Sequence, residues 1–232
     1  MKIFAIGDLH LSINNPKPMD IFGEQWEGYI DKIFADWRAR VGQDDLVLLP
    51  GDFSWAMKLS DAEADFKLLS SLPGKKIIIR GNHDYWWSSI SAVRNMLPTN
   101  FYAIQNDAMI FDNVIICGTR GWSVPEPNQK VSAEDDKILK REIIRLELSL
   151  QAAKKLQTNG QKIICMLHFP PFNFHREPNE MTRLIQEYGV SKVVFGHLHG
   201  YKGAKLEYKL GETDCYLTSC DMLECKLKEI DV

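Results

Sequence analysis

The chain has 232 residues, a length that fits one large domain or two small ones, and its 45% hydrophobic content is enough for a continuous buried core. With 28 Lys and Arg against 31 Asp and Glu, the formal net charge of −3 excludes a protein-wide field that attracts nucleic acid. The first apolar run is interrupted at Gly7 and Asp8, which is too early for a signal peptide or a membrane anchor. The five cysteines include no CxxC pair, which favours buried reduced thiols over a disulfide framework. We therefore expect one cytoplasmic domain over residues 1–232 and no membrane contact.

Short apolar runs rich in β-branched residues predict strands that are buried on both faces. They cover residues 2–6, 46–49, 77–79, 114–117, 163–167 and 193–195. Between the first of these runs, apolar residues at helical spacing predict an amphipathic helix over residues 26–41. Two further helices are expected over residues 61–72 and 87–96, because a proline follows each of them closely.

The second half of the chain predicts one long helix and two hairpins. Ser132 and Asp135 resemble a capping box that begins a helix ending near residue 157. Residues 108–111 and 114–117 flank a two-residue turn, and residues 205–210 and 215–219 flank a turn centred on Gly211. Residues 120–130 contain two prolines and are expected to form a surface loop. The pattern predicts an α/β fold with mixed sheets, or a two-sheet sandwich with helices outside, rather than a purely parallel sheet.

Polar residues gather at the ends of the predicted strands. Five of the six histidines follow an apolar run within a few residues, and two aspartates and an asparagine take equivalent positions. These residues are His10, His83, His168, His197, His199, Asp8, Asp52 and Asn82. Because the carboxyl ends of strands in an α/β sheet meet at one edge, we expect these side chains to converge. His175 is the one histidine outside this pattern.

The residue types in this set are those of a metal site without cysteine. Carboxylate oxygen mixed with imidazole nitrogen suits Mn²⁺, Fe or Zn²⁺, and the absence of cysteine from the motifs argues against a closed structural zinc site. Even seven of these eight residues as ligands would be too many for one tetrahedral ion. They match two ions that share a bridging carboxylate at a separation of roughly 3.5–4 Å.

The order of the motifs resembles that of the calcineurin-like metallophosphoesterase superfamily. The motifs run from residue 7 to residue 199 as Gly7-Asp8-Leu9-His10, Gly51-Asp52, Gly81-Asn82-His83-Asp84, His168 and Gly196-His197-Leu198-His199. The resemblance implies a four-layer α/β/β/α sandwich with two divalent or trivalent metal ions. It assigns Asp8, His10 and His199 to the first ion, Asn82, His168 and His197 to the second, and Asp52 to both as a bridge.

The same resemblance implies hydrolysis of a phosphomonoester or phosphodiester by a metal-bridging hydroxide. His83 and Asp84 would be the catalytic residues: His83 contacts the phosphate or the leaving group, and Asp84 orients His83 through a hydrogen bond. A small phosphate ester is the expected substrate, because the chain has little length beyond the motifs for a separate recognition domain. The motifs distinguish neither monoester from diester nor one metal from another, and they leave the oligomeric state open.

Simpler interpretations remain for several of these residues. Aspartate after a strand is commonly a turn residue or a helix cap, Asn82 could be a turn residue beside Gly81, and Asp84 could cap the next helix. The aromatic residues near the motifs could stack on a substrate or pack in the core; these are Trp55, Tyr85, Trp86 and Trp87. Candidates for substrate contacts outside the motifs are Arg80, Arg120, His175 and Arg176.

Two other functions are compatible with the fold that the resemblance implies. A non-catalytic binding or scaffold protein would be expected to lose metal ligands or the histidine of the GNHD motif, and here all of them are present. A nuclease would use the same metals, but it needs a groove for a polyanion. The acidic charge balance and the lack of a basic run disfavour that function.

Overall fold

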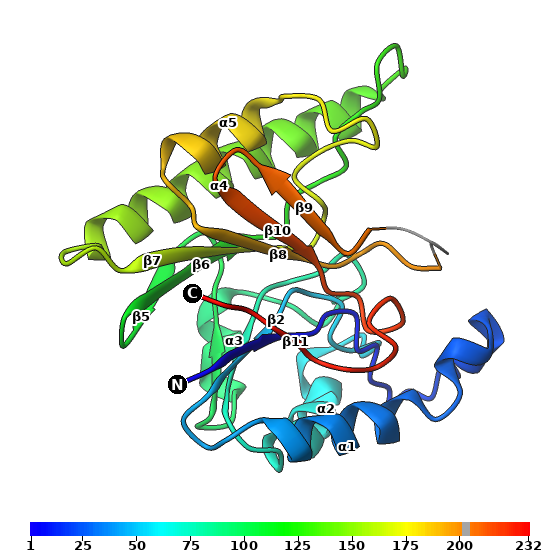
Figure 1. The fold of residues 1–232 in the computed structure, drawn as a ribbon. Coiled ribbons are helices and arrows are strands. Elements are labelled where there is room, and N and C mark those ends of the chain that lie inside the picture. Colours follow the sequence, from blue (N-terminus) through cyan, green and yellow to red (C-terminus); the bar gives the residue numbers. More distant parts are fainter. Residues whose placement is uncertain (201–204) are drawn as a thin grey trace.

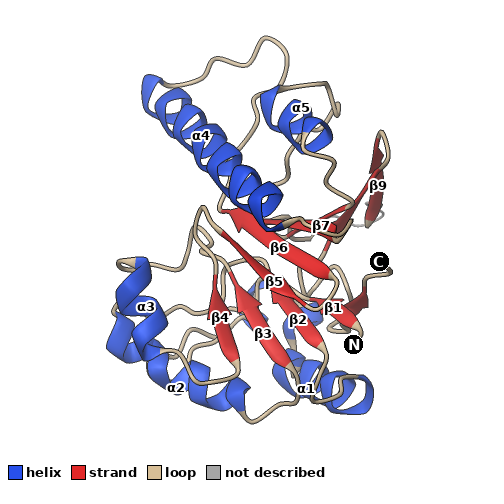
Figure 2. Cartoon of the chain, turned by 90° about the vertical axis from the view of Figure 1, so that its left-hand side faces the viewer, coloured by secondary structure: helices blue, strands red, loops and turns tan. Residues whose placement is uncertain are grey.

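Two β-sheets lie face to face, and helices cover the outer face of each sheet (Figure 1, Figure 2). The computed structural model describes residues 1–200 and 205–232. In this part of the chain the strand order is β11-β1-β2-β3-β4 in the first sheet and β5-β6-β7-β8-β10-β9 in the second. The predicted α/β sandwich of four layers, with helices outside two mixed sheets, is confirmed.

The first sheet is built around four parallel strands. These are β1 (Ile3–Ala5), β2 (Leu46–Leu49), β3 (Lys75–Ile78) and β4 (Phe101–Ala103), and the short β11 (Lys228–Glu229) pairs antiparallel with β1. Three helices pack on the first sheet: α1 (Tyr29–Arg40), α2 (Leu59–Ser70) and α3 (Ile90–Met96). In the view of Figure 1, α1 and α2 lie below the sheet.

The second sheet has a parallel centre and a hairpin at each edge. Its central strands are β6 (Val114–Thr119), β7 (Lys162–Leu167), β8 (Lys192–Phe195) and β10 (Thr213–Leu217). The edge strands β5 (Ala108–Phe111) and β9 (Glu207–Leu210) pair antiparallel with β6 and β10. Above this sheet lie α4 (Ala133–Leu156) and α5 (Glu180–Glu187) (Figure 1).

Buried side chains form three hydrophobic layers between the four structural layers. Residues such as Ile77 and Ile116 fill the space between the sheets, while Phe66 packs between the first sheet and its helices, and Leu150 lies on the side of α4 and α5. Successive residues of a strand point to opposite faces, so a strand buried on both faces needs apolar residues at every position. This is why the central strands read as continuous apolar runs.

The predicted strands, long helices and hairpins are confirmed, with shifted ends. The helix expected from residue 26 begins at Tyr29, because Trp26 belongs to a separate 3₁₀ turn (Glu24–Trp26) and Gly28 interrupts the chain with φ 58°. The helix expected from residue 87 begins only at Ile90, where the Ser89 hydroxyl caps it. Strands β4 and β11 and helix α5 were not predicted. No helix of the described residues is long and apolar enough to cross a membrane.

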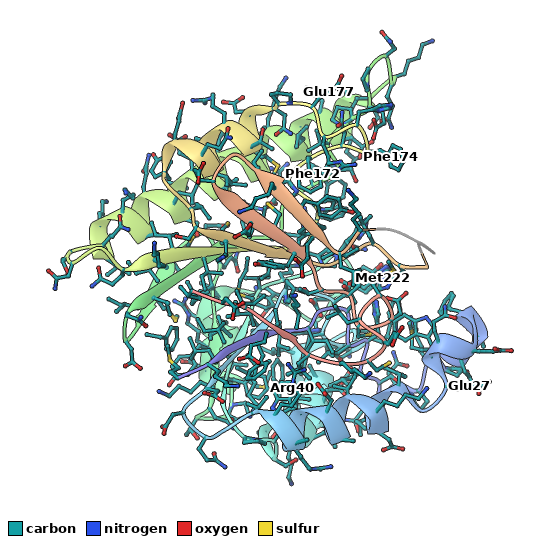
Figure 3. All side chains as sticks on the ribbon, viewed as in Figure 1. Glu27, Arg40, Phe172, Phe174, Glu177 and Met222 are labelled. Carbon is teal, nitrogen blue, oxygen red and sulfur yellow. The ribbon has the colours of Figure 1, made fainter. Side chains whose placement is uncertain are left out.

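The segment after β10 crosses from the second sheet to the first. The carbonyl of Thr218 accepts a 2.7 Å hydrogen bond from the Gly7 amide, and the Cys220 amide donates to the Gly7 carbonyl at 3.1 Å. Farther along, Arg40 of α1, labelled in Figure 3, donates to the Leu227 carbonyl at 2.6 Å. The two sheets are therefore joined at the carboxyl end of β1, where the first predicted metal ligands lie.

Candidate metal centre

The loops that follow five parallel strands converge at one end of the sandwich. Strands β1, β2 and β3 of the first sheet lead to Asp8, His10, Asp52 and Asn82, while β7 and β8 of the second sheet lead to His168, His197 and His199. Two groups of possible ligand atoms, each within 4.8 Å of one another, share Asp8: one adds His10 and His199, and the other adds Asp52 and His168. The convergence expected from the sequence is therefore observed.

The backbone of this site is strained. Asp8, His10, Asp52 and His197 have φ values of 58°, 46°, 50° and 71°, a region that side-chain-bearing residues rarely occupy. Such conformations cost roughly 1–3 kcal/mol each, and they persist where the surrounding structure enforces them, commonly at functional sites. Four of the seven predicted ligands are therefore held in orientations that an unstrained loop would not adopt.

Two glycines allow the carboxylates to approach the neighbouring loops. A β-carbon at Gly81 would collide with the side chain and amide of Asp52, and one at Gly196 would collide with the carboxylate of Asp8. Because these positions lack a side chain, the motif loops can lie directly against the carboxylates. Close packing against the carboxylates therefore requires glycine at the positions before Asn82 and His197.

The first group of ligand atoms surrounds Asp8. Its Oδ1 lies 3.5 Å from Nε2 of His199, and both of its oxygens accept hydrogen bonds from the His197 amide. The other ring nitrogen of His199, Nδ1, lies 2.8 Å from Oδ1 of Asp221. A proton on Nδ1 satisfies this contact and leaves the lone pair of Nε2 directed towards Asp8, which is the arrangement of a histidine that binds a metal.

A second group of residues meets at Oδ1 of Asn82 and consists of Asn82, His168 and His197; it shares only His168 with the cluster of Asp8, Asp52 and His168. Nδ1 of His168 lies 3.0 Å from the Pro50 carbonyl, an acceptor, so the proton belongs on Nδ1 and Nε2 carries the lone pair. That Nε2 lies 2.6 Å from Oδ1 of Asn82, and Nδ1 of His197 lies 3.0 Å from the same oxygen. The lone pair of His168 Nε2 and Oδ1 of Asn82 thus face each other, and a cation between them would relieve their repulsion. Nδ1 of His197, in the tautomer that leaves it unprotonated, would complete this set of ligand atoms.

Asp52 lies between the two groups. Its Oδ1 accepts a 2.8 Å hydrogen bond from the His83 amide, which fixes the carboxylate plane. Its Oδ2 lies 3.8 Å from Nε2 of His10 and 3.5 Å from Nε2 of His168. One carboxylate oxygen therefore faces a histidine from each group.

The electrostatics of the site fit cations. Burial is the largest cause that lowers the pKa of His10 to about 3 and of His197 to about 4, so both imidazoles are neutral near pH 7 and can offer lone pairs. Burial, followed by the charge of Asp8, raises the pKa of Asp52 to about 8. Asp8 and Asp52 are both buried and have ligand oxygens within 4.8 Å of each other, so their negative charges repel. Divalent ions would remove that repulsion. The chemistry and arrangement of the donors fit the metals that the resemblance implies.

Asp221 is a site residue that the sequence did not reveal. It is buried, and its second oxygen accepts a 3.0 Å hydrogen bond from the Gly200 amide. Burial lowers the pKa of His199, but the hydrogen bonds to Asp221 and Asp8 outweigh burial and raise it to about 10. Asp221 follows β10 by four residues, so the rule that located the other ligands, a polar residue just after a strand, also applies to it.

The predicted hydrogen bond between Asp84 and His83 is wrong. Asp84 accepts from the amides of Phe53, Ser54 and Gly81 and from the indole of Trp86, at 2.7–3.1 Å. It therefore joins the loop after β2 to the loop after β3. It does not cap a helix either, because α3 begins only at Ile90. Nδ1 of His83 is buried and has no partner within the described residues, and burial lowers the pKa of this histidine.

The aromatic residues near the motifs divide into two kinds. Trp86 and Trp87 are buried in the core, as the packing interpretation expected. Trp55 stacks on His10 with ring centroids 4.7 Å apart and lies 4.6 Å from His83, while Tyr85 is half exposed beside His83. Trp55 and Tyr85 therefore line the side of the site that carries His83.

Two of the additional candidates for substrate contacts have surface partners. Nδ1 of His175 lies 2.6 Å from Oε2 of Glu126, and Arg176 lies over the ring of Tyr208 at 5.2 Å. The same loop carries Phe174, which is 77% exposed and projects from the edge of the molecule in Figure 3. His175 and Arg176 are thus tied to neighbouring segments. Nε of Arg80 and Nε of Arg120 are buried without a partner among the described residues, although the terminal Nη2 of Arg120 contacts Glu142 at 3.4 Å.

Comparison with known proteins identifies the class. Residues 1–201 match the calcineurin-like phosphoesterase family, and the chain belongs to this family. It is therefore a phosphoester hydrolase of a metal-dependent class, and its described residues include candidate ligand clusters for metal ions. No curated protein matches the chain.

Solved structures with low sequence identity share the fold. TT1561 of Thermus thermophilus is 14% identical with a TM-score of 0.60, and the match covers 99% of this chain and 98% of that one. A phosphopantetheinyl hydrolase from Mycobacterium tuberculosis is 14% identical with a TM-score of 0.57 over 99% and 95%. A protein of unknown function from Aquifex aeolicus, AQ665, is 12% identical with a TM-score of 0.53 over 98% and 95%. At these identities the likeness concerns the fold.

Proposed function

We propose that the protein hydrolyses a small phosphomonoester or phosphodiester with a pair of metal ions, Mn, Fe or Zn, held by its seven converging ligands. The observation that carries this proposal is the position of Asp52. Its Oδ2 lies 3.8 Å from Nε2 of His10 and 3.5 Å from Nε2 of His168, so one oxygen faces both ligand groups. A carboxylate in this position suits a bridge between two ions.

The proposed assignment follows the two groups of ligand atoms. Asp8, His10 and His199 would hold one ion, Asn82, His168 and His197 would hold the other, and Asp52 would contact both. When bound, the ions supply positive charge against the phosphoryl oxygens and make water acidic enough to act as a nucleophile near pH 7. The protein's own contribution is to hold the imidazoles in place and to direct their Nε2 atoms, through Pro50 for His168 and Asp221 for His199. Because the pKa of His199 is about 10, its Nε2 would lose a proton when an ion binds.

His83 is the proposed contact to the leaving group. It is half-buried, and its ring lies 5.7 Å from that of His10 without sharing the ligand contacts. Burial lowers its pKa, so near pH 7 the neutral ring donates one hydrogen bond to a phosphoryl or leaving-group oxygen. Asp84 supports this role indirectly, because its four hydrogen bonds hold the loop that carries His83.

The test is hydrolysis of p-nitrophenyl phosphate and bis(p-nitrophenyl) phosphate with Mn²⁺, Fe²⁺ or Zn²⁺. We expect turnover of at least one ester that Asp52→Asn lowers by about 10²-fold or more, because loss of even a partner of a metal ligand costs about 10- to 100-fold and this substitution removes the charge of a proposed ligand itself. Asp31→Asn, on the exposed face of α1, is the matched control and should behave as the wild type. Metal binding without turnover of either ester would instead indicate a non-catalytic binding protein.

The organisation and location of the protein remain proposals. We infer that residues 1–232 form one domain, which the crossing of the chain from β10 to β11 supports, because the first and last strands belong to the same sheet. All five cysteines are buried and unpaired, which supports a reducing cytoplasmic environment.

A further inference from the structure

Two arginines beside the second ligand group lack partners for part of their guanidinium groups. Arg80 follows β3, and Arg120 follows β6 directly, so both lie at the edge of the sandwich that carries the candidate metal centre. Nε of each is buried without a hydrogen-bond partner among the described residues. Buried donors without acceptors are rare in proteins, because each carries a desolvation cost.

The positive charge at this place exceeds the negative charge that balances it. Glu142 of α4 is buried and accepts from Arg145 at 2.6 Å, from the Thr119 hydroxyl at 2.9 Å and from Arg120 at 3.4 Å. Arg80 has neither a hydrogen bond nor an ion pair from its guanidinium within residues 1–200 and 205–232. The two arginines flank the same pair of residues: Arg80 lies two residues before Asn82, the Arg120 carbonyl accepts from the His168 amide, and Nε2 of His168 lies 2.6 Å from Oδ1 of Asn82. Burial lowers the pKa of Arg120, Glu142 raises it, and the charge of Arg80 adds to the lowering.

These arginines adjoin the site through backbone and ring contacts. The amides of His168 and Phe169 each donate a 3.0 Å hydrogen bond to the Arg120 carbonyl. The ring of Phe169 lies 4.0 Å from the ring of His197 and 4.9 Å from the ring of Trp122. The Arg120 guanidinium lies over the Trp122 ring at 4.7 Å. On the other side, only Gly81 separates Arg80 from Asn82. The unpaired charge therefore lies next to the proposed second ion.

We propose that Arg80 and Arg120 form a subsite for a second phosphoryl group of the substrate, next to the phosphoryl group that the metals hold. This inference rests on the proposed function and narrows it to substrates with at least two phosphoryl groups close together. Guanidinium groups match phosphate oxygens in a forked geometry, and a phosphoryl group has enough oxygens to accept from both arginines. The terminal nitrogens of Arg80, which make no hydrogen bond or ion pair within residues 1–200 and 205–232, would be the donors to such an anion.

The test is calorimetric binding of methylenebisphosphonate and methylphosphonate to the Mn²⁺-loaded protein, with equal free Mn²⁺ in cell and syringe. These non-hydrolysable probes differ in the second phosphoryl group. We expect the wild type to bind the bisphosphonate at least about 10-fold more tightly than methylphosphonate. Arg80→Gln should lower the affinity for the bisphosphonate by about 10- to 100-fold, since charge-assisted hydrogen bonds are strong. The same variant should change methylphosphonate binding less than about 3-fold. Arg80→Lys keeps the charge but loses the forked donor geometry, so its affinity for the bisphosphonate should lie between those of the wild type and Arg80→Gln.

Controls separate binding from folding. Arg38→Gln, on the exposed side of α1, should bind both probes as the wild type does. Because Arg80 makes no side-chain hydrogen bond or ion pair with the described residues, Arg80→Gln should melt at or above the wild-type temperature. Arg120→Gln tests the second member of the pair, and its melting temperature shows whether the loss of the Glu142 contact affects folding.

The outcomes distinguish this inference from the proposed function. Equal affinity for the two probes in the wild type, or an unchanged preference in Arg80→Gln, would overturn the subsite even if aryl phosphates are hydrolysed. A bisphosphonate preference that depends on Arg80, in a protein that hydrolyses no phosphate ester, would support the subsite and refute the hydrolysis. The binding measurement decides the inference in either case.

Discussion

At the scale of single residues, the candidate metal centre depends on contacts that leave no spare space. Gly81 lies against the carboxylate and amide of Asp52, and Asp52 is the residue that faces both ligand groups. A side chain as small as a methyl group at this position must displace Asp52 or the loop that carries Asn82 and His83. The geometry of the site is therefore sensitive to changes that add no charge and remove no ligand.

We predict that Gly81→Ala lowers phosphoesterase activity by about 10²-fold, because the new β-carbon displaces the carboxylate of Asp52, the proposed bridge. Gly81 is not in the left-handed region, so the effect is steric and not a backbone preference. Steady-state hydrolysis of an aryl phosphate measures it. Gly42→Ala, in the turn after α1 and also without a positive φ, is the matched control. Activity of Gly81→Ala within about 3-fold of the wild type would show that Asp52 is not held as described.

Asp221 provides a second prediction at this scale. Its carboxylate accepts the Nδ1 proton of His199 and thereby orients Nε2 towards Asp8. Partners of this kind typically change metal affinity by about 10- to 100-fold, so Asp221→Asn should weaken binding of one Mn²⁺ by that factor. Competition of the protein with a chelator for Mn²⁺ measures the affinity. The exposed Asp44→Asn is the control, and equal affinities in the two variants would contradict the role of Asp221.

At the scale of elements, the junction between α2 and β3 contains a buried charge. Lys76 of β3 is fully buried, and its ammonium donates to the carbonyls of Leu72 and Gly74. It has no carboxylate partner within the described residues. These hydrogen bonds satisfy carbonyls beyond the end of α2, but the burial of the charge lowers the pKa of Lys76 to about 8 from its ordinary 10.5.

This shift predicts a stability that rises with pH. Below pH 8 the lysine is charged in both states and the folded state bears the desolvation cost; between pH 8 and 10.5 the folded state loses its proton first, and the cost disappears. The free energy of unfolding of the wild type, minus that of Lys76→Met, should rise by roughly 2 kcal/mol from pH 7 to pH 10. Urea unfolding at both values measures it. Lys75→Met is the control, and a difference that stays constant or falls would contradict the shift.

At the scale of the whole molecule, the proposed ions would link the two sheets. Asp8, His10, Asp52 and Asn82 come from loops of the first sheet, and His168, His197 and His199 come from loops of the second. Ions that bind these loops together bind only the folded chain. Their binding free energy therefore adds to the free energy of unfolding.

We predict that Mn²⁺ at about 100 times its dissociation constant stabilises the protein by about 2.7 kcal/mol for each ion that binds. For a chain of this size, each ion corresponds to a rise in melting temperature of roughly 5–10 °C. Differential scanning calorimetry in Mn²⁺ and in a chelator measures the shift. A double variant, His10→Ala with His168→Ala, should lose it, because each ligand group then lacks a histidine. Identical melting temperatures of the wild type in both solutions would contradict metal binding by the folded state.

The regular elements and the ligand motifs were predictable because their signals are local. A run of apolar residues predicts a strand such as β7, and the predicted ligands follow such runs closely in the chain, as Asp52 follows β2. Strand β11 consists of the two residues Lys228 and Glu229, and β4 of three, which is too short for any periodicity. Their pairing depends on neighbouring strands that are already in place.

Only the tertiary structure decided which residues meet across the fold. The sequence by itself determined the order of the motifs, and with it the class of enzyme and the expected ligand types. It did not determine that Asp221 reaches His199, that Asp84 binds backbone amides and the Trp86 indole in place of the His83 ring, or that the Arg120 carbonyl accepts from the His168 amide. The physical reason is that these contacts join loops from different strands, so their geometry follows from how the two sheets pack and not from the spacing of residues along the chain.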